Sequence, residues 1–76
     1  MNSQISFAQA QSLVLARLEQ DKSQLPRSEW DKKRYIIGPW VKLSINELID
    51  AVKRGTPIGK TYIIENATSL GYTVIV

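Results

Sequence analysis

Cysteine and histidine are both absent from this chain of 76 residues. Their absence excludes disulfides and thiol chemistry, and it removes the side chains that most often bind transition metals. A general base would then have to be a carboxylate or a lysine with a strongly shifted pKa, which requires a deep pocket. A domain of this size buries only about 60% of its unfolded surface and rarely encloses such a pocket. We therefore expect no enzyme activity, no catalytic residue, no metal and no cofactor.

Long apolar runs are also absent, and none approaches the ~20 residues of a membrane-spanning helix. The first residues, Met-Asn-Ser-Gln, lack the charged and apolar regions of a signal peptide. We expect a single small domain over residues 1–76, located in the cytoplasm and without a membrane partner. Ten Lys and Arg against seven Asp and Glu give a net charge of +3, which permits an anionic partner without requiring one.

Three helices are predicted from their start and stop signals. Ser6 with Gln9 and Ser44 with Glu47 are typical of capping boxes, before helices over residues 7–20 and 45–54. Gly55 ends the second helix, and Thr56-Pro57 predicts the start of a third over residues 57–70. Their spacing predicts buried faces made of Phe7, Ala10, Val14 and Leu18, of Ile45, Leu48, Ile49 and Val52, and of Tyr62, Ile63, Ala67 and Leu70. In a competing interpretation, residues 61–64 are a strand that pairs with residues 72–76.

The remaining segments are predicted as a loop and two extended regions. Residues 21–33 form a polar connecting loop, in which Pro26 prevents helical geometry at Leu25 and Ser28 is suited to start a short turn. Residues 35–43 are either one strand interrupted at Gly38-Pro39, or a strand followed by a buried approach to the next helix. Residues 72–76 form a strand, which we expect to pair with residues 35–43. The predicted fold class is therefore α+β, with three short helices packed on a minimal two-stranded sheet in the order helix-strand-helix-helix-strand.

Cationic and aromatic side chains are interleaved between residues 27 and 42. Cations can neutralise phosphates, and aromatic faces can stack on bases or anchor in a pocket of a protein partner. We predict a protein-binding segment whose contact residues are Trp30, Lys32, Lys33, Arg34 and Trp40. In the alternative interpretation, Tyr35 and Trp40 belong to the core, Trp30 holds the loop in place, and the cations are ordinary solvated charges.

The order of the predicted elements also matches that of a winged helix-turn-helix domain, with residues 57–70 as the recognition helix. Such a helix would bind nucleic acid through Lys60, Thr61, Asn66 and Ser69. The helix carries only one cation and one anion, which counts against DNA binding.

The apolar residues 72–76 are either a central strand or an edge strand. At an edge they would pair with another chain, giving a homo-oligomer or a docked partner. The function we expect first is a non-enzymatic protein-interaction or regulatory module. DNA binding is the second candidate, and a structural subunit of a larger assembly is the third.

Overall fold

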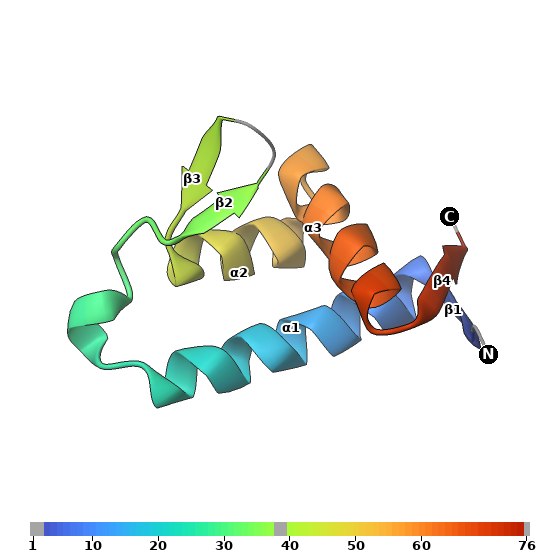
Figure 1. Ribbon diagram of the computed structural model, residues 1–76, viewed down its shortest axis with the longest axis horizontal. Helices are drawn as coiled ribbons and strands as arrows, with labels where there is room; N and C mark the ends of the chain where they lie inside the picture. The colour runs from blue at the N-terminus through green and yellow to red at the C-terminus, as the bar shows by residue number, and fades with distance from the viewer. Residues whose placement is uncertain (1–2, 38–39, 76) are drawn as a thin grey trace.

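The computed structural model describes residues 3–37 and 40–75 of the chain. The class is α+β, as predicted, but the strands form two small sheets instead of the single sheet expected (Figure 1). The elements in order are β1 (Ser3–Ser6), α1 (Phe7–Gln24), the 3-10 turn η1 (Arg27–Glu29), β2 (Tyr35–Ile37), β3 (Val41–Leu43), α2 (Ile45–Arg54), α3 (Pro57–Ser69) and β4 (Tyr72–Ile75).

Both predicted capping boxes are present. The Ser6 hydroxyl accepts from the Gln9 N–H at 3.1 Å, and the Gln9 amide oxygen accepts from the Ser6 N–H at 2.9 Å. Ser44 and Glu47 make the same reciprocal pair at 3.2 and 3.0 Å. The Thr56 hydroxyl accepts from the Gly59 N–H at 3.2 Å and so caps α3. The third segment is therefore a helix, and the interpretation of residues 61–64 as a strand is wrong.

Helix α1 is longer than the sequence predicts, because it ends at Gln24 instead of residue 20. No helix breaker occurs before Pro26, and the polar residues 21–24 tolerate an exposed helical turn. Leu25 takes extended geometry (φ −92°, ψ 141°), as expected of a residue that precedes proline. The connection to β2 therefore starts four residues later than predicted, and it contains η1.

The three helices enclose one hydrophobic core. Every predicted core residue of α2 is buried, together with Ala10, Val14 and Leu18 of α1 and Ile63 and Ala67 of α3. Phe7 and Tyr62 are half-buried against this core. The prediction that Leu70 is buried is wrong. Leu70 is the C-cap of α3, beyond the last helical turn, and its side chain is 40% exposed.

The strand pairing differs from the prediction. Residues 35–37 pair with residues 41–43 as an antiparallel hairpin, in the register Tyr35–Leu43 to Ile37–Val41. Strand β4 pairs instead with β1 in parallel, from Ser3–Tyr72 to Ser6–Ile75. The expected pairing of residues 35–43 with residues 72–76 is therefore wrong. Residues 35–43 are also neither one interrupted strand nor a strand followed by a buried approach to the next helix. A local reversal closes a much shorter loop than a pairing with residues 72–76 would, and so costs less chain entropy.

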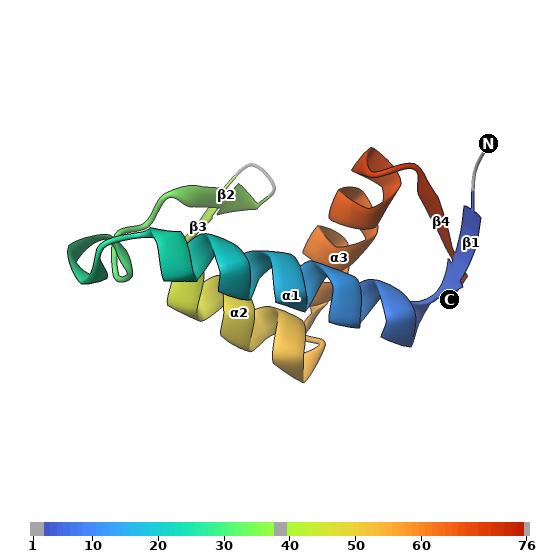
Figure 2. The same ribbon diagram turned by 90° about the horizontal axis from the view of Figure 1, so that it is seen from below.

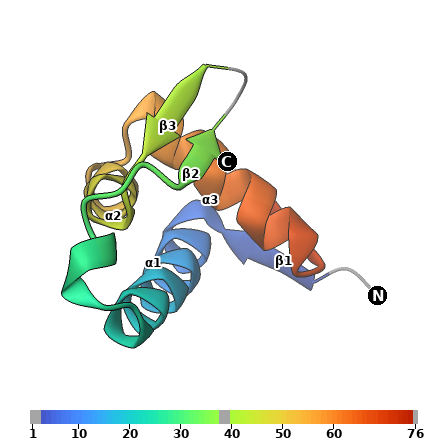
Figure 3. The ribbon, with the colours of Figure 1, turned by 60° about the vertical axis from the view of Figure 1, so that its left-hand side comes forward.

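The two sheets lie at separate places on the helical core. The β2–β3 hairpin, called the hairpin below, covers α2 and α3 on the side away from α1 (Figure 3). The β1–β4 sheet lies where α1 begins, and there the first and last strands of the chain lie side by side (Figure 2). Within residues 3–37 and 40–75, no helix has the length and apolar character required to cross a membrane.

Candidate protein-binding surface on the hairpin

The hairpin has an inner and an outer face. Side chains alternate between the two faces of a strand, so Tyr35, Ile37, Val41 and Leu43 share the face that packs on the core. The outer face carries Ile36 and Lys42, which are direct cross-strand partners. Both are exposed, and 67% of the Ile36 surface is accessible to solvent.

Trp40 extends this outer face. It lies directly before β3, two positions before Lys42. Its side chain is 89% exposed, more than any other large hydrophobic residue among those described. Trp40 is therefore not a core residue, and the alternative interpretation is wrong for it. We call the surface formed by Ile36, Trp40 and Lys42 the outer hairpin face.

Trp30, the other predicted aromatic contact, lies elsewhere and is half-buried. Its indole N–H donates to the carbonyl oxygens of Lys22 and Leu25, each at 3.2 Å. The Lys22 ammonium lies 4.4 Å from the ring centroid, and the Arg27 guanidinium lies 5.6 Å from it. Trp30 thus fixes the connection against the end of α1, which agrees with its alternative, structural interpretation.

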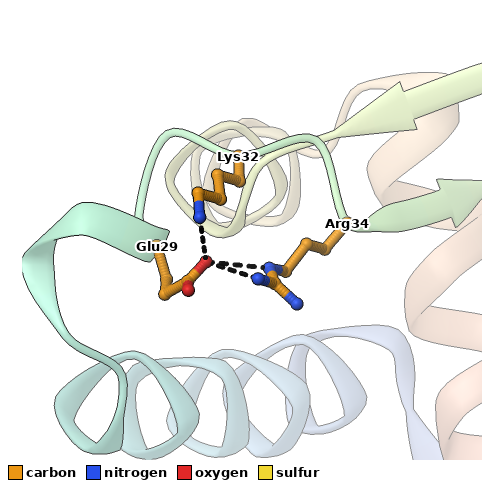
Figure 4. A network of polar contacts seen from close by, with 3 residues as sticks. All are labelled: Glu29, Lys32 and Arg34. Atoms are coloured by element: carbon orange, nitrogen blue, oxygen red, sulfur yellow. Dashed lines mark hydrogen bonds and ion pairs between the residues drawn. The ribbon is translucent and has the colours of Figure 1, made fainter.

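Lys32 and Arg34 share one acidic partner (Figure 4). The Glu29 carboxylate accepts from Arg34 Nη2 at 2.5 Å and from Arg34 Nε at 3.1 Å, and Lys32 Nζ lies 3.2 Å from the same oxygen. The hydrogen bond from Arg34, followed by that from Lys32, lowers the pKa of Glu29 below its ordinary value of 4.5. These cations are solvent-exposed, but their charge is partly compensated within the connection.

Lys33 points to a different carboxylate and forms an ion pair with Glu47, the capping residue of α2. The pKa of Glu47 falls from 4.5 to about 2. The largest cause is the hydrogen bond from Lys33, and the next is the hydrogen bond from the Ser44 N–H. The link joins the segment before the hairpin to the start of α2. Lys33 therefore connects two elements of the fold in addition to adding positive charge.

The positive charge of the chain is concentrated around the hairpin. Residues 27–42 hold five cations (Arg27, Lys32, Lys33, Arg34, Lys42) and two acids (Glu29, Asp31), an excess of +3. The remaining five cations and five acids cancel, so this segment accounts for the whole net charge. No ion pair involves Lys42 among the residues described. The outer hairpin face is therefore apolar and positively charged.

The residues predicted to bind nucleic acid all lie on α3. Lys60, Thr61 and Ser69 are exposed, whereas Asn66 is half-buried. The Thr61 hydroxyl donates to the Pro57 carbonyl at 3.0 Å, so its donor is already used. The exposed side of α3 carries Lys60 and Glu65, whose charges cancel, and this balance gives no electrostatic preference for DNA.

Other kinds of site find no support in the described part of the chain. Residues 3–37 and 40–75 contain no group of three or more acidic, cysteine or histidine side chains that could hold a metal ion. Comparison of the chain with protein-family models, curated proteins and solved structures gives no match. Inference about function therefore depends on the surface itself.

Ile36 is a surface residue that was not predicted from the sequence. Its neighbours Tyr35 and Ile37 are apolar, so composition alone indicates a buried strand. The available signal was Gly38-Pro39, which is typical of a turn. Gly38 and Pro39 themselves lie outside the described residues, but a hairpin of residues 35–37 and 41–43 places Ile36 opposite Lys42.

Proposed function

We propose that this protein is a non-enzymatic interaction module that binds another protein through the outer hairpin face. The observation that carries the proposal is the exposure of two large apolar side chains of one short hairpin, Ile36 on β2 and Trp40 directly before β3. Exposed large apolar side chains that lie together are typical of binding sites, and tryptophan is among the residues that contribute most to binding energy. The packed inner face of the hairpin holds these side chains in place before a partner arrives.

The charge around the hairpin favours an acidic partner surface. Lys42 lies directly opposite Ile36, and the segment that leads into the hairpin holds the rest of the +3 excess. Complementary charges speed association and select among partners more than they add affinity. Trp30, by contrast, belongs to the scaffold in this proposal, and Lys32, Lys33 and Arg34 contribute to the field around the site.

The test is affinity capture of binding proteins from the cells that produce this chain. Trp40→Ser removes the central apolar side chain from the outer hairpin face. Ile64→Ser is the matched control, because Ile64 is an exposed apolar residue on α3, with 38% of its surface accessible. We expect at least one protein to be retained by the unmodified chain and by Ile64→Ser, and lost with Trp40→Ser. An identical set of proteins with all three forms would contradict the proposal.

A further inference from the structure

The β1–β4 sheet consists of only two parallel strands. Ile5, Tyr72 and Val74 pack toward the core, while Gln4, Thr73 and Ile75 are exposed. Parallel pairs are slightly less stable than antiparallel ones, and parallel sheets are usually larger and covered on both faces. Among the described residues neither strand has a second neighbour, so each leaves one edge with unpaired backbone N–H and C=O groups.

The edge of β4 lacks the features that usually protect an edge strand. Such edges carry lysine or proline, or they are interrupted by a bulge. Residues 66–76 contain no charged residue and no proline, and Ile75 is 55% exposed. Strand β4 is also richer in β-branched and aromatic residues than β1, in which Ile5 is the only apolar residue. Of the two open edges, that of β4 is the better suited to accept another strand.

Independently of the proposed function, we infer that β4 pairs antiparallel with β4 of a second copy of this chain. A two-fold axis brings the strand against its own copy, so a charged strand would meet its own charge. The uncharged residues 66–76 avoid this repulsion, whereas residues 27–42, which include most of the hairpin and carry the +3 excess, would repel their copy. The charge distribution therefore assigns β4 to self-association and the hairpin to a different partner.

The paired strands would form one four-stranded sheet with the helices of both copies on the same side. Directly opposed residues of antiparallel strands share a face. The registers that pair most residues therefore place Thr73 opposite either its own copy or Ile75 of the second chain. In both registers the exposed face of β4 gains cross-strand contacts that it lacks in a single chain.

Sedimentation equilibrium over a wide range of concentration tests this inference, with the double variant Thr73→Lys/Ile75→Lys and the control Gln4→Lys. Gln4 is the β1 residue paired with Thr73, and both are exposed. We expect the average mass to rise with concentration from 8.6 kDa toward that of two chains. Lysines on β4 should abolish the rise, and Gln4→Lys should leave it unchanged.

Amide hydrogen exchange of the unmodified chain provides a second readout that does not depend on how the variants fold. Protection of the amides of residues 73–75 should increase with concentration, while that of residues 3–5 stays constant. A single-chain mass at every concentration would overturn the inference. So would an assembly that Gln4→Lys disrupts and the β4 lysines do not.

Discussion

Gly59 lies directly against the carbonyl of Ala51. A Cβ built on Gly59 would be 2.0 Å from the Ala51 oxygen and 2.5 Å from its carbon, both backbone atoms that cannot move without moving α2. This contact sets how closely α2 and α3 approach each other. The hairpin rests on both helices, β2 against α3 and β3 against α2, so the contact also determines the support of the outer hairpin face.

Gly59→Ala should lower the free energy of unfolding by at least about 3 kcal/mol, the upper part of the range for overpacking a well-packed contact. The matched control is Gly55→Ala, at a residue with φ of +66° and no atom within 4 Å of its Cβ position. That change adds only backbone strain, about 1 kcal/mol. Urea unfolding of both variants measures the difference, and an equal or larger loss for Gly55→Ala would contradict the account of this contact.

The two tryptophans should differ in their effect on stability. Trp30→Phe removes the N–H that donates to Lys22 and Leu25, and should cost about 1 kcal/mol of unfolding free energy. Trp40→Phe changes an exposed side chain and should stay within about 0.5 kcal/mol of the unmodified chain. Chemical denaturation followed by circular dichroism compares them. A larger loss for Trp40→Phe would mean that Trp40 belongs to the core.

The ion pair of Lys33 with Glu47 predicts a pH dependence of stability. The pKa of Glu47 falls from 4.5 to about 2 in the folded chain, so folding favours its charged form. The resulting stabilisation is fully present above pH 4.5 and is lost as the pH falls toward 2. Glu47→Gln keeps an acceptor for the Ser44 N–H but loses the charge.

The stability difference between the unmodified chain and Glu47→Gln should therefore be largest near neutral pH and shrink through that acidic range. Thermal unfolding of both proteins in a pH series provides the measurement. Glu29, whose pKa is also lowered, is present in both proteins, so its contribution cancels in the comparison. A difference that did not change with pH would exclude the ion pair as its source.

The helices could be predicted because their signals are local. Each capping box depends on side chains three residues apart, and the apolar spacing of α2 identifies all of its buried residues. The strand pairing could not be predicted in the same way. Residues 3–6 carry little β-propensity, and their pairing with residues 72–75 joins segments almost a chain length apart. Such a contact is decided by the packing of the helices between them.

The candidate site could be predicted only in part. The interleaved cations and aromatics predicted the segment that contains the candidate surface, and Trp40 in it is exposed. The same pattern included Trp30, because sequence does not show that the end of α1 supplies two carbonyl acceptors for its indole. Ile36 was missed because exposure on a hairpin depends on the register, which follows from the turn.

We expect the outer hairpin face to bind a protein partner through Trp40, and the affinity of a captured partner for two purified variants tests this. Trp40→Ser should weaken binding at least about 30-fold, equivalent to about 2 kcal/mol and typical of a residue at the centre of an interface. Trp30→Phe should leave the affinity unchanged. Unchanged affinity for Trp40→Ser, or an equal loss for both variants, would contradict the account.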